Sequence, residues 1–171
     1  MDRFLLIGSD GYLGSSFKKY LKKQNKIIYE YKYNDFYSNK SFNSFKGKIR
    51  NIIHFAISTS LNKEKNFNHD INFARNLFKF SKKNKINCFY ISSISAFKGN
   101  YSAYSILKQK IEKDARKHNI NIIRPGMIWA NKPRSWFGSI DKIVQMCFLI
   151  IPLIGKGNHH IYLVHLNDFL K

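Results

Sequence analysis

A tyrosine and a lysine stand four residues apart in the segment 104–108 (YSILK). At this spacing, two side chains are neighbours on one face of a helix. A tyrosine hydroxyl has an ordinary pKa of about 10, but a nearby cation favours the phenolate. Tyr104 could therefore exchange a proton with a substrate hydroxyl group, assisted by Lys108. Ser93, at the end of the preceding predicted strand, could hydrogen-bond the same oxygen, with Ser95 as the alternative. Taken alone, the spacing is also common on exposed helix faces.

A second motif lies near the start of the chain, where Gly8, Gly11 and Gly14 follow a short apolar run. Glycines allow a sharp turn and the close approach of a diphosphate, and the N-terminus of the following helix favours negative charge. The segment therefore has the form of a strand, a phosphate-binding turn and a helix. Glycines also punctuate ordinary turns, so a purely structural turn is the alternative.

The composition narrows the class of protein. The 171 residues are 44% hydrophobic, which suits one domain with a sizeable core, and 16% are aromatic, which argues against disorder. Cys88 and Cys147 lie far apart, with neither a CxxC motif nor a paired histidine. They are expected to be buried free thiols in a reducing compartment, and no metal site is expected.

The formal net charge of +20 could indicate binding to nucleic acid or anionic lipid. However, the excess is spread along the chain in pairs such as Lys22-Lys23 and Lys82-Lys83, so we expect no specific nucleic-acid partner.

We also expect no signal peptide, because the first strand follows Met1 almost directly. The apolar run 143–154 is too short to cross a bilayer and is expected to be a core or interface helix, not a transmembrane segment.

Strands are predicted at residues 4–7, 26–31, 51–56, 86–91 and 120–123, and helices from about residue 13, at 66–84 and at about 103–118. Residues 34–50 are expected to form a loop or a short irregular helix. This alternation predicts an α/β fold with a parallel sheet.

Glu30, near the end of the second strand, is a candidate to hold the ribose hydroxyls of a dinucleotide, whereas Lys32 would favour a 2′-phosphate. His54 is expected to be a structural histidine with satisfied hydrogen bonds.

These motifs, in this order, resemble the extended short-chain dehydrogenase/reductase superfamily, in particular its atypical NAD-dependent epimerase/dehydratase members. The resemblance covers nearly the whole chain and rests on seven segments: 8–14 (GSDGYLG), 53–56 (IHFA), 70–72 (DIN), 90–93 (YISS), 104–108 (YSILK), 124–126 (RPG) and 164–168 (VHLND).

The resemblance implies a Rossmann-like, doubly wound parallel sheet that binds NAD or NADP. Tyr104 would be the acid/base, Lys108 would lower its pKa and bind the nicotinamide ribose, and Ser93 would orient the substrate oxygen. The remaining implication is a set of cofactor contacts from Gly8, Asp10, Gly11, Tyr12, Leu13, Gly14, Glu30, Ala56, Ile57, Ser58, Asn72, Tyr104, Lys108 and Pro125.

The chain also departs from the family pattern. An acidic residue expected near the adenine has no clear counterpart in residues 34–50, and the interval from Ser93 to Tyr104 is short. The chain ends at Lys171, just after the VHLND segment, where family members continue with a substrate-binding stretch. We therefore expect one dinucleotide-binding domain, residues 1–171, in which about 132–160 begin a substrate-binding lobe that is largely missing.

Three functional hypotheses follow. The first is a cytoplasmic NAD(P)-dependent epimerase, dehydratase or reductase that transfers a hydride to or from a nucleotide-activated sugar, with a homodimer as one expected assembly. Its sugar substrate rests on the resemblance alone, because one fold hosts many chemistries. The second is a catalytically impaired dinucleotide-binding regulatory module or a truncated fragment. The third, nucleic-acid binding, rests only on the charge.

Overall fold

The structure is a computed structural model that describes residues 2–32, 35, 41–55, 64–130 and 162–171. It divides into two compact units, Met1–Arg124 and Pro125–Lys171, which are described separately below. The expectation of a single domain over 1–171 stays a prediction. Residues 132–160, where a substrate-binding lobe was expected to begin, and the apolar run 143–154 lie outside the described residues.

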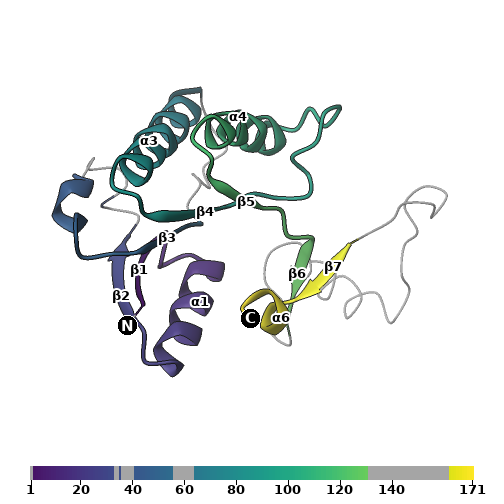
Figure 1. Ribbon diagram of the computed structural model, residues 1–171. Coiled ribbons are helices and arrows are strands. Elements are labelled where there is room, and N and C mark those ends of the chain that lie inside the picture. Colours follow the sequence, from purple (N-terminus) through teal and green to yellow (C-terminus); the bar gives the residue numbers. More distant parts are fainter. Residues whose placement is uncertain (1, 33–34, 36–40, 56–63, 131–161) are drawn as a thin grey trace. The chain divides into compact units, whose positions relative to one another are not determined.

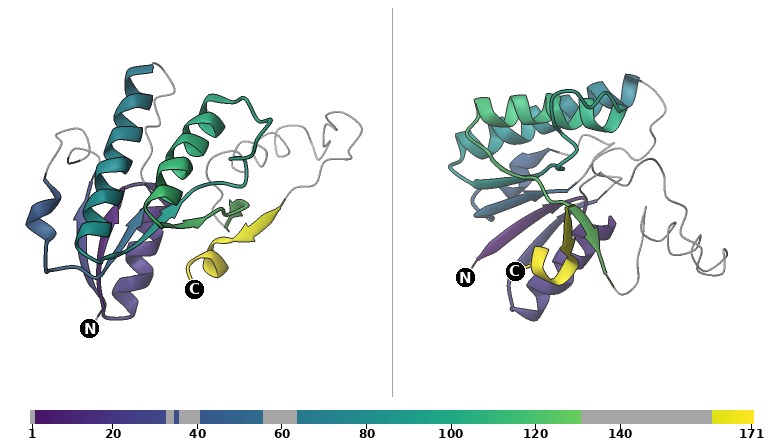
Figure 2. Two further views of the ribbon diagram at one scale, coloured as in Figure 1. Left: turned by 45° about the horizontal axis from the view of Figure 1, so that its top comes forward. Right: turned by 90° about the vertical axis from the view of Figure 1, so that its right-hand side faces the viewer.

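The first unit is built on five parallel strands: β1 (Arg3–Ile7), β2 (Ile27–Tyr31), β3 (Asn51–His54), β4 (Asn87–Ile91) and β5 (Asn121–Ile123). They lie in the order β2-β1-β3-β4-β5. Helix α1 (Tyr12–Lys23) covers one face of the sheet, and α3 (Glu64–Lys83) and α4 (Ala103–Lys117) cover the other (Figures 1 and 2). The sheet is thus doubly wound and Rossmann-like, as predicted, because each parallel crossover needs a helix on one of the two faces.

The core lies between the sheet and the helix pair α3 and α4. Strands covered on both faces carry apolar runs, and Leu5, Leu6 and Ile7 of β1 are completely buried. Helix α3 adds Phe73, Ala74, Leu77 and Phe78 at helical spacing, all of them buried. The periodicity seen in the sequence therefore corresponds to one buried helix face.

His54 belongs to this core, with 1% of its surface exposed. Its ring centroid lies 5.3 Å from that of Tyr90 and 5.7 Å from that of Phe73. Burial, together with the charge of Lys108, lowers its pKa to about 3, so the ring is neutral at physiological pH. The expected structural role is seen, but Nδ1 has no hydrogen-bond partner among the described residues, so the histidine is not fully satisfied there.

Between β2 and β3, a short 3₁₀-helix, η1 (Phe42–Phe45), agrees with the expectation of an irregular helix in this region. Ser41 caps it by accepting a hydrogen bond from the Asn43 N–H. The rings of Phe42 and Phe45 lie 5.4 and 6.4 Å from that of Tyr31, measured between centroids. This aromatic contact fastens the segment to the end of β2.

The second unit contains the parallel pair β6 (Met127–Trp129) and β7 (Leu163–His165), followed by α6 (Leu166–Phe169). Gly126 lets the backbone before β6 lie close to the backbone before β7, because a Cβ on Gly126 would overlap the carbonyl oxygen of Tyr162. The His165 side chain caps α6 by accepting a hydrogen bond from the Asn167 N–H. Among the described residues of both units, no helix is long and apolar enough to cross a membrane.

Candidate active site

The carboxyl ends of the five parallel strands meet at one edge of the sheet. Gly8 follows β1 at this edge, and Ser92 and Ser93 follow β4. The strand register places Ile7 beside His54 and His54 beside Tyr90, so β3 alone separates the glycine turn from the serines. At the usual strand spacing, the two segments are about 10 Å apart. From β1 the chain adds β2 on one side of the sheet and then β3, β4 and β5 on the other side, so the strand order reverses between β1 and β3. Open α/β sheets bind ligands at such a position.

The three glycines of the turn have different physical roles. Gly8 has a φ of 81°, which favours glycine, and its carbonyl accepts a hydrogen bond of 3.2 Å from the Gly11 N–H. A Cβ on Gly14 would overlap the same carbonyl group, so the fold itself excludes a side chain there. A Cβ on Gly11 would instead make only an ordinary contact of 3.4 Å with it. The surface of the turn at Gly11 is therefore open to an approaching group.

Helix α1 begins directly after this turn, with Gly11 as its N-cap and no side-chain cap. Its first turn has no acidic residue, and Lys22 and Lys23 lie in its last turn. The N–H groups at a helix start lack intrahelical partners and can bind an anion. Around them, Asp10 is exposed, and Tyr12 and Leu13 are half-buried.

Glu30 reaches the glycine turn, as its assignment to a dinucleotide requires. Its Oε2 accepts a hydrogen bond of 2.8 Å from Ser9 Oγ and one of 3.1 Å from Lys18 Nζ. Burial alone would raise the pKa of this carboxyl group, but the hydrogen bonds from Ser9 and Lys18 lower it below its ordinary value. Glu30 is therefore a carboxylate already held by the turn and by α1, two contacts that the sequence did not suggest.

Ser93, Tyr104 and Lys108 come together at the start of α4. Ser102 caps this helix by accepting a hydrogen bond from the Ser105 N–H. Lys108 is only 2% exposed, and its Nζ donates a hydrogen bond of 2.7 Å to the Ile91 carbonyl. The same Nζ lies 5.7 Å from the ring centroid of Tyr104. The tyrosine itself is 37% exposed, so its ring is accessible to a ligand.

The ionisation of these residues differs from the expectation. Burial raises the pKa of Tyr104 above its ordinary value, a hydrogen bond with Ser93 only partly opposes this effect, and the phenol stays protonated at neutral pH. Burial also lowers the pKa of Lys108 to about 7, against the opposing charges of Asp70 and Glu112. The tyrosine pKa is therefore raised and not lowered, because desolvation of the phenolate outweighs the hydrogen bond with Ser93.

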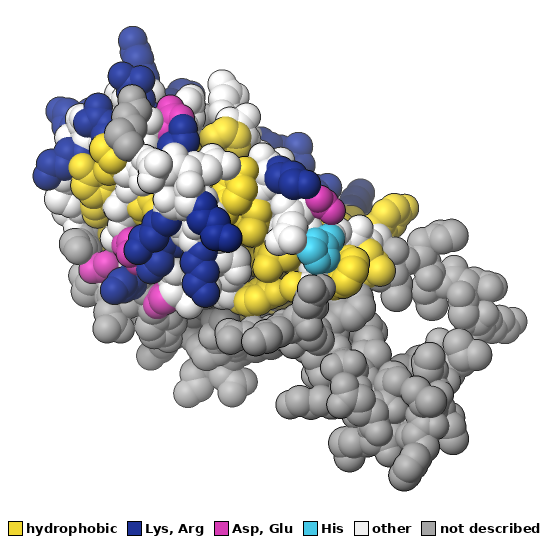
Figure 3. Space-filling view, turned by 90° about the horizontal axis from the view of Figure 1, so that it is seen from below, with side chains coloured by type: hydrophobic (Ala, Val, Ile, Leu, Met, Phe, Trp, Pro, Cys, Tyr) yellow, Lys and Arg dark blue, Asp and Glu magenta, His cyan; other side chains and the backbone are white. Residues whose placement is uncertain are grey.

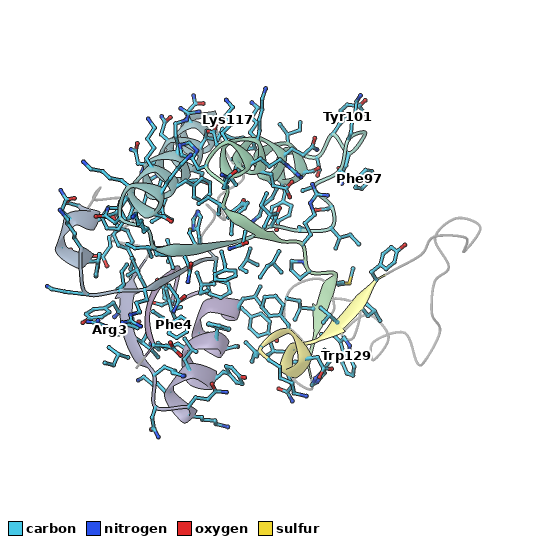
Figure 4. The ribbon with its side chains drawn as sticks, in the orientation of Figure 1. Arg3, Phe4, Phe97, Tyr101, Lys117 and Trp129 are labelled. Atoms are coloured by element: carbon cyan, nitrogen blue, oxygen red, sulfur yellow. The ribbon has the colours of Figure 1, made fainter. Side chains whose placement is uncertain are left out.

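Ser95, the alternative to Ser93, lies in the same turn. The two hydroxyl oxygens are 2.9 Å apart, and the Ser95 N–H donates to Ser93 Oγ at 3.2 Å. The hydrogen bond to Tyr104 favours Ser93 as the substrate-facing serine. The following loop carries Phe97 and Tyr101, which are 54% and 84% exposed (Figure 4).

Two buried carboxylates lie near Lys108, and the sequence predicted no role for either, although Asp70 belongs to the segment 70–72 on which the family resemblance partly rests. Asp70 of α3 and Glu112 of α4 are each 2% exposed, and both charges raise the lysine pKa. Glu112 carried a signal, because it follows Lys108 by four residues and so lies on the same helix face. The sequence also contained a signal for the burial of Asp70, because Asp70 lies at helical spacing from the buried Phe73 and Ala74.

Of the remaining predicted cofactor contacts, Asn72 alone lies in a described part of the first unit. Asn72 is exposed on α3 and accepts a hydrogen bond of 3.2 Å from Arg75 Nη1. Pro125 begins the second unit, and Ala56, Ile57 and Ser58 lie outside the described residues. Their contacts with a cofactor remain predictions. Within the described ranges, no group of three or more His, Cys, Asp or Glu residues could hold a metal ion.

No family model and no curated protein matches the chain by sequence. Solved structures do match by fold. UDP-N-acetylglucosamine 4-epimerase from Bacillus cereus is 20% identical, with a TM-score of 0.72, and the match covers 99% of this chain and 69% of that one. L-threonine 3-dehydrogenase from Trypanosoma brucei is 16% identical, with a TM-score of 0.74, over 99% of this chain and 68% of that one.

A third similar structure is a dTDP-4-dehydrorhamnose reductase from Bacillus anthracis, solved in complex with NADP. It is 19% identical, with a TM-score of 0.67, over 85% of this chain and 61% of that one. In these and other matches to solved structures, this chain covers between 60% and 71% of the length of the matched chain. The chain therefore shares the fold of these solved epimerase, dehydrogenase and reductase structures.

Proposed function

We propose that this chain binds NAD or NADP at the glycine turn and acts, alone or as part of a longer protein, as an epimerase, dehydratase or reductase of a nucleotide-activated sugar. The observation that carries the proposal is the grouping of Ser93, Tyr104 and the buried Lys108 at the sheet edge that also holds the open glycine turn. The plain explanation of YxxxK as an exposed helix face does not account for a lysine that is 2% exposed.

The residues of the turn fit a dinucleotide. The space beside Gly11, which a side chain would fill, would admit the diphosphate, and the start of α1 would donate N–H groups to it. Glu30 beside Ser9 would accept hydrogen bonds from ribose hydroxyls. When bound, the cofactor supplies hydride exchange with a substrate carbon. Lys108 would face the nicotinamide ribose.

The chain's own residues would move and hold the proton. Tyr104, protonated at neutral pH because burial raises its pKa, would donate its proton to a substrate oxygen and recover it in the reverse direction. Ser93 would hydrogen-bond the same oxygen and keep it near the phenol. Lys108, with its pKa lowered to about 7 by burial, would offset negative charge that develops on the tyrosine oxygen.

The sugar substrate is supported by the reductase and the epimerase among the similar structures, whose printed substrates are nucleotide sugars. The threonine dehydrogenase has the same fold, so fold alone does not decide the substrate. A panel of nucleotide sugars, incubated with the purified chain and either cofactor, would test this step. Conversion of none of them, together with conversion of an amino or hydroxy acid, would contradict the sugar assignment.

Cofactor binding is tested first and separately, by calorimetry with NAD(H) and NADP(H). Saturable binding of at least one dinucleotide is expected. No saturation at millimolar concentration would overturn the proposal.

A second candidate is a dinucleotide-binding regulatory module without turnover. It is favoured by the fact that the glycine turn, Glu30, Ser93, Tyr104 and Lys108 all belong to the first unit, Met1–Arg124. Cofactor binding would then rest mainly on residues of the first unit. Tight binding combined with no conversion of any substrate in the panel would support this candidate over the enzyme.

A further inference from the structure

The buried carboxylate of Glu112 joins three elements behind the candidate site. Its Oε1 accepts a hydrogen bond of 2.7 Å from Ser92 Oγ and another of 2.7 Å from Arg124 Nε. Its Oε2 accepts from Arg124 Nη2, and from Arg116 Nη2 at 3.2 Å. The side chain of Glu112 is only 3% exposed. Charge-assisted bonds of this kind are roughly twice as strong as neutral ones.

The partners of Glu112 place it next to the reactive groups. Ser92 directly precedes Ser93 at the end of β4, and Arg124 directly follows the last residue of β5. The Ser92 N–H also donates to the Ile123 carbonyl at 2.7 Å, so the two strand ends are joined to each other. Glu112 lies on the face of α4 that carries Tyr104 and Lys108, eight and four residues before it.

We propose that Glu112 is a positioning residue for the Ser93–Tyr104 pair, because its carboxylate fixes the ends of β4 and β5 to the helix that carries Tyr104. This inference rests on the proposed function. Ser93 is on a strand end and Tyr104 on a helix, so their hydrogen bond depends on the distance between these two elements. Glu112 holds that distance through Ser92 at the strand end, beyond the point where Lys108 bonds to the Ile91 carbonyl.

The carboxylate also acts on Lys108 through its charge. The groups that influence Lys108 or lie against it come from each element packed around it: His54 on β3, Asp70 on α3, Tyr90 on β4, and Tyr104 and Glu112 on α4. Asp70 and Glu112 supply the negative charges in this group, and both favour the ammonium form. Loss of one of these charges should lower the pKa of Lys108 further.

Asp114 offers a matched control. It is on the same helix, two residues after Glu112, and 6% exposed. Its Oδ2 lies 2.8 Å from Arg75 Nη2, so it joins α4 to α3 and not to the strand ends. A residue that only stabilises the fold would behave like Asp114.

The test compares Glu112→Gln and Asp114→Asn in the full 171-residue chain. In Glu112→Gln, amide hydrogen exchange over residues 92–96 should become about tenfold faster or more, because the strand end loses its anchor. The pKa of Lys108, followed by NMR with isotope-labelled lysine and assigned with Lys108→Met, should fall by about one unit. Asp114→Asn should change neither measurement. Equal effects of the two variants would overturn the proposal and indicate that Glu112 only stabilises the fold.

Glu112→Asp separates geometry from charge. It keeps the carboxylate but shortens its reach by one methylene, so the pKa of Lys108 should be largely restored while exchange over 92–96 stays fast. If Glu112→Gln does not fold, Ser92→Ala removes one bond of the same anchor. Unchanged exchange over residues 93–96 in Ser92→Ala would then overturn the proposal.

Turnover supplies a third readout. Where the chain converts a substrate, Glu112→Gln should lower kcat by about 100-fold, the size of loss that a misplacement of about 1 Å can cause, and leave KM and cofactor affinity little changed. If no variant has turnover, the enzymatic function fails for the 171-residue chain by itself, but exchange and the lysine pKa still decide the role of Glu112. A loss of cofactor affinity equal to the loss of kcat would contradict the positioning role.

Discussion

The Nζ atom of Lys108 donates a hydrogen bond of 2.7 Å to the carbonyl oxygen of Ile91, the last residue of β4. This bond joins the helix that carries Tyr104 to the strand whose end carries Ser93. It also keeps an ammonium group away from solvent, and burial therefore lowers the lysine pKa to about 7. A lysine in this setting is typical of a functional site and not of a solvated helix face.

Replacement of Tyr104 by phenylalanine should remove most turnover and leave cofactor affinity nearly unchanged. The ring keeps its packing, and only the proton-exchanging oxygen is lost. General acid/base catalysis typically contributes about 100- to 10,000-fold, so kcat should fall within that range. Tyr101→Phe is the matched control, because Tyr101 is 84% exposed on the preceding loop. Equal kcat values for Tyr104→Phe and the unaltered chain would show that Tyr104 is not the acid/base.

Two glycine substitutions should separate folding from binding. Gly14→Ala should destabilise the fold by about 1–3 kcal/mol, because its Cβ overlaps the Gly8 carbonyl. Gly11→Thr should leave the melting temperature nearly unchanged, since threonine is a good N-cap and its Cβ would make only an ordinary contact of 3.4 Å with the Gly8 carbonyl oxygen. Its branched side chain should nevertheless abolish dinucleotide binding measured by calorimetry. Undiminished binding in Gly11→Thr would place the diphosphate elsewhere.

Glu30→Gln should raise the affinity for NADP relative to NAD. A carboxylate accepts hydrogen bonds from free ribose hydroxyls but repels a 2′-phosphate, while Lys18, 3.1 Å from Glu30, would be released to attract one. We expect the ratio of the two Kd values to change by about tenfold, or about 1.4 kcal/mol. Asp2→Asn, which removes another lysine-paired acid before β1, should leave the ratio unaltered. A ratio that moves equally in both variants would indicate a general charge effect.

The buried His54 should make the fold sensitive to acid. Its pKa is lowered from 6.5 to about 3, so the unfolded chain binds one proton more than the folded chain between these pH values. Stability from this residue is fully present above pH 6.5 and is lost as the pH falls towards 3. The slope of unfolding free energy against pH should approach about 1.4 kcal/mol per unit from this group.

Denaturant titrations of His54→Phe over the same pH range would test this. The variant should show a shallower slope, whatever its absolute stability. A slope identical to that of the unaltered chain would mean that His54 is already protonated in the folded state.

The basic surface should bind DNA only nonspecifically. Figure 3 shows lysine and arginine side chains with acidic ones among them, on the face that includes α1. Part of this charge is already paired, as in Lys18–Glu30 and Lys26–Asp2. Binding to any duplex should weaken steeply between low and physiological salt, because it depends on counterion release. A sequence-selective complex that survives physiological salt would favour the nucleic-acid hypothesis.

The predictions from periodicity and motifs agree closely with the structure. Each of the five predicted strands is present within one or two residues at either end, and the helices predicted at 66–84 and 103–118 are α3 and α4. Such features depend on neighbours within about one turn of helix or a few residues of strand, so the local sequence contains the necessary information. The glycine turn and the pair Tyr104 and Lys108 belong to this group.

What the sequence alone determined is therefore the order of the elements and the residues that each presents at the sheet edge. Only the tertiary structure decided their chemical state. The pairs Lys108–Ile91, Glu30–Ser9 and Glu112–Arg124 join residues 17, 21 and 12 positions apart. The tyrosine pKa is raised, against the expectation, because desolvation depends on everything packed around a group. The extent to which a titratable group is desolvated is a property of the assembled layers, and no local pattern of residues determines it.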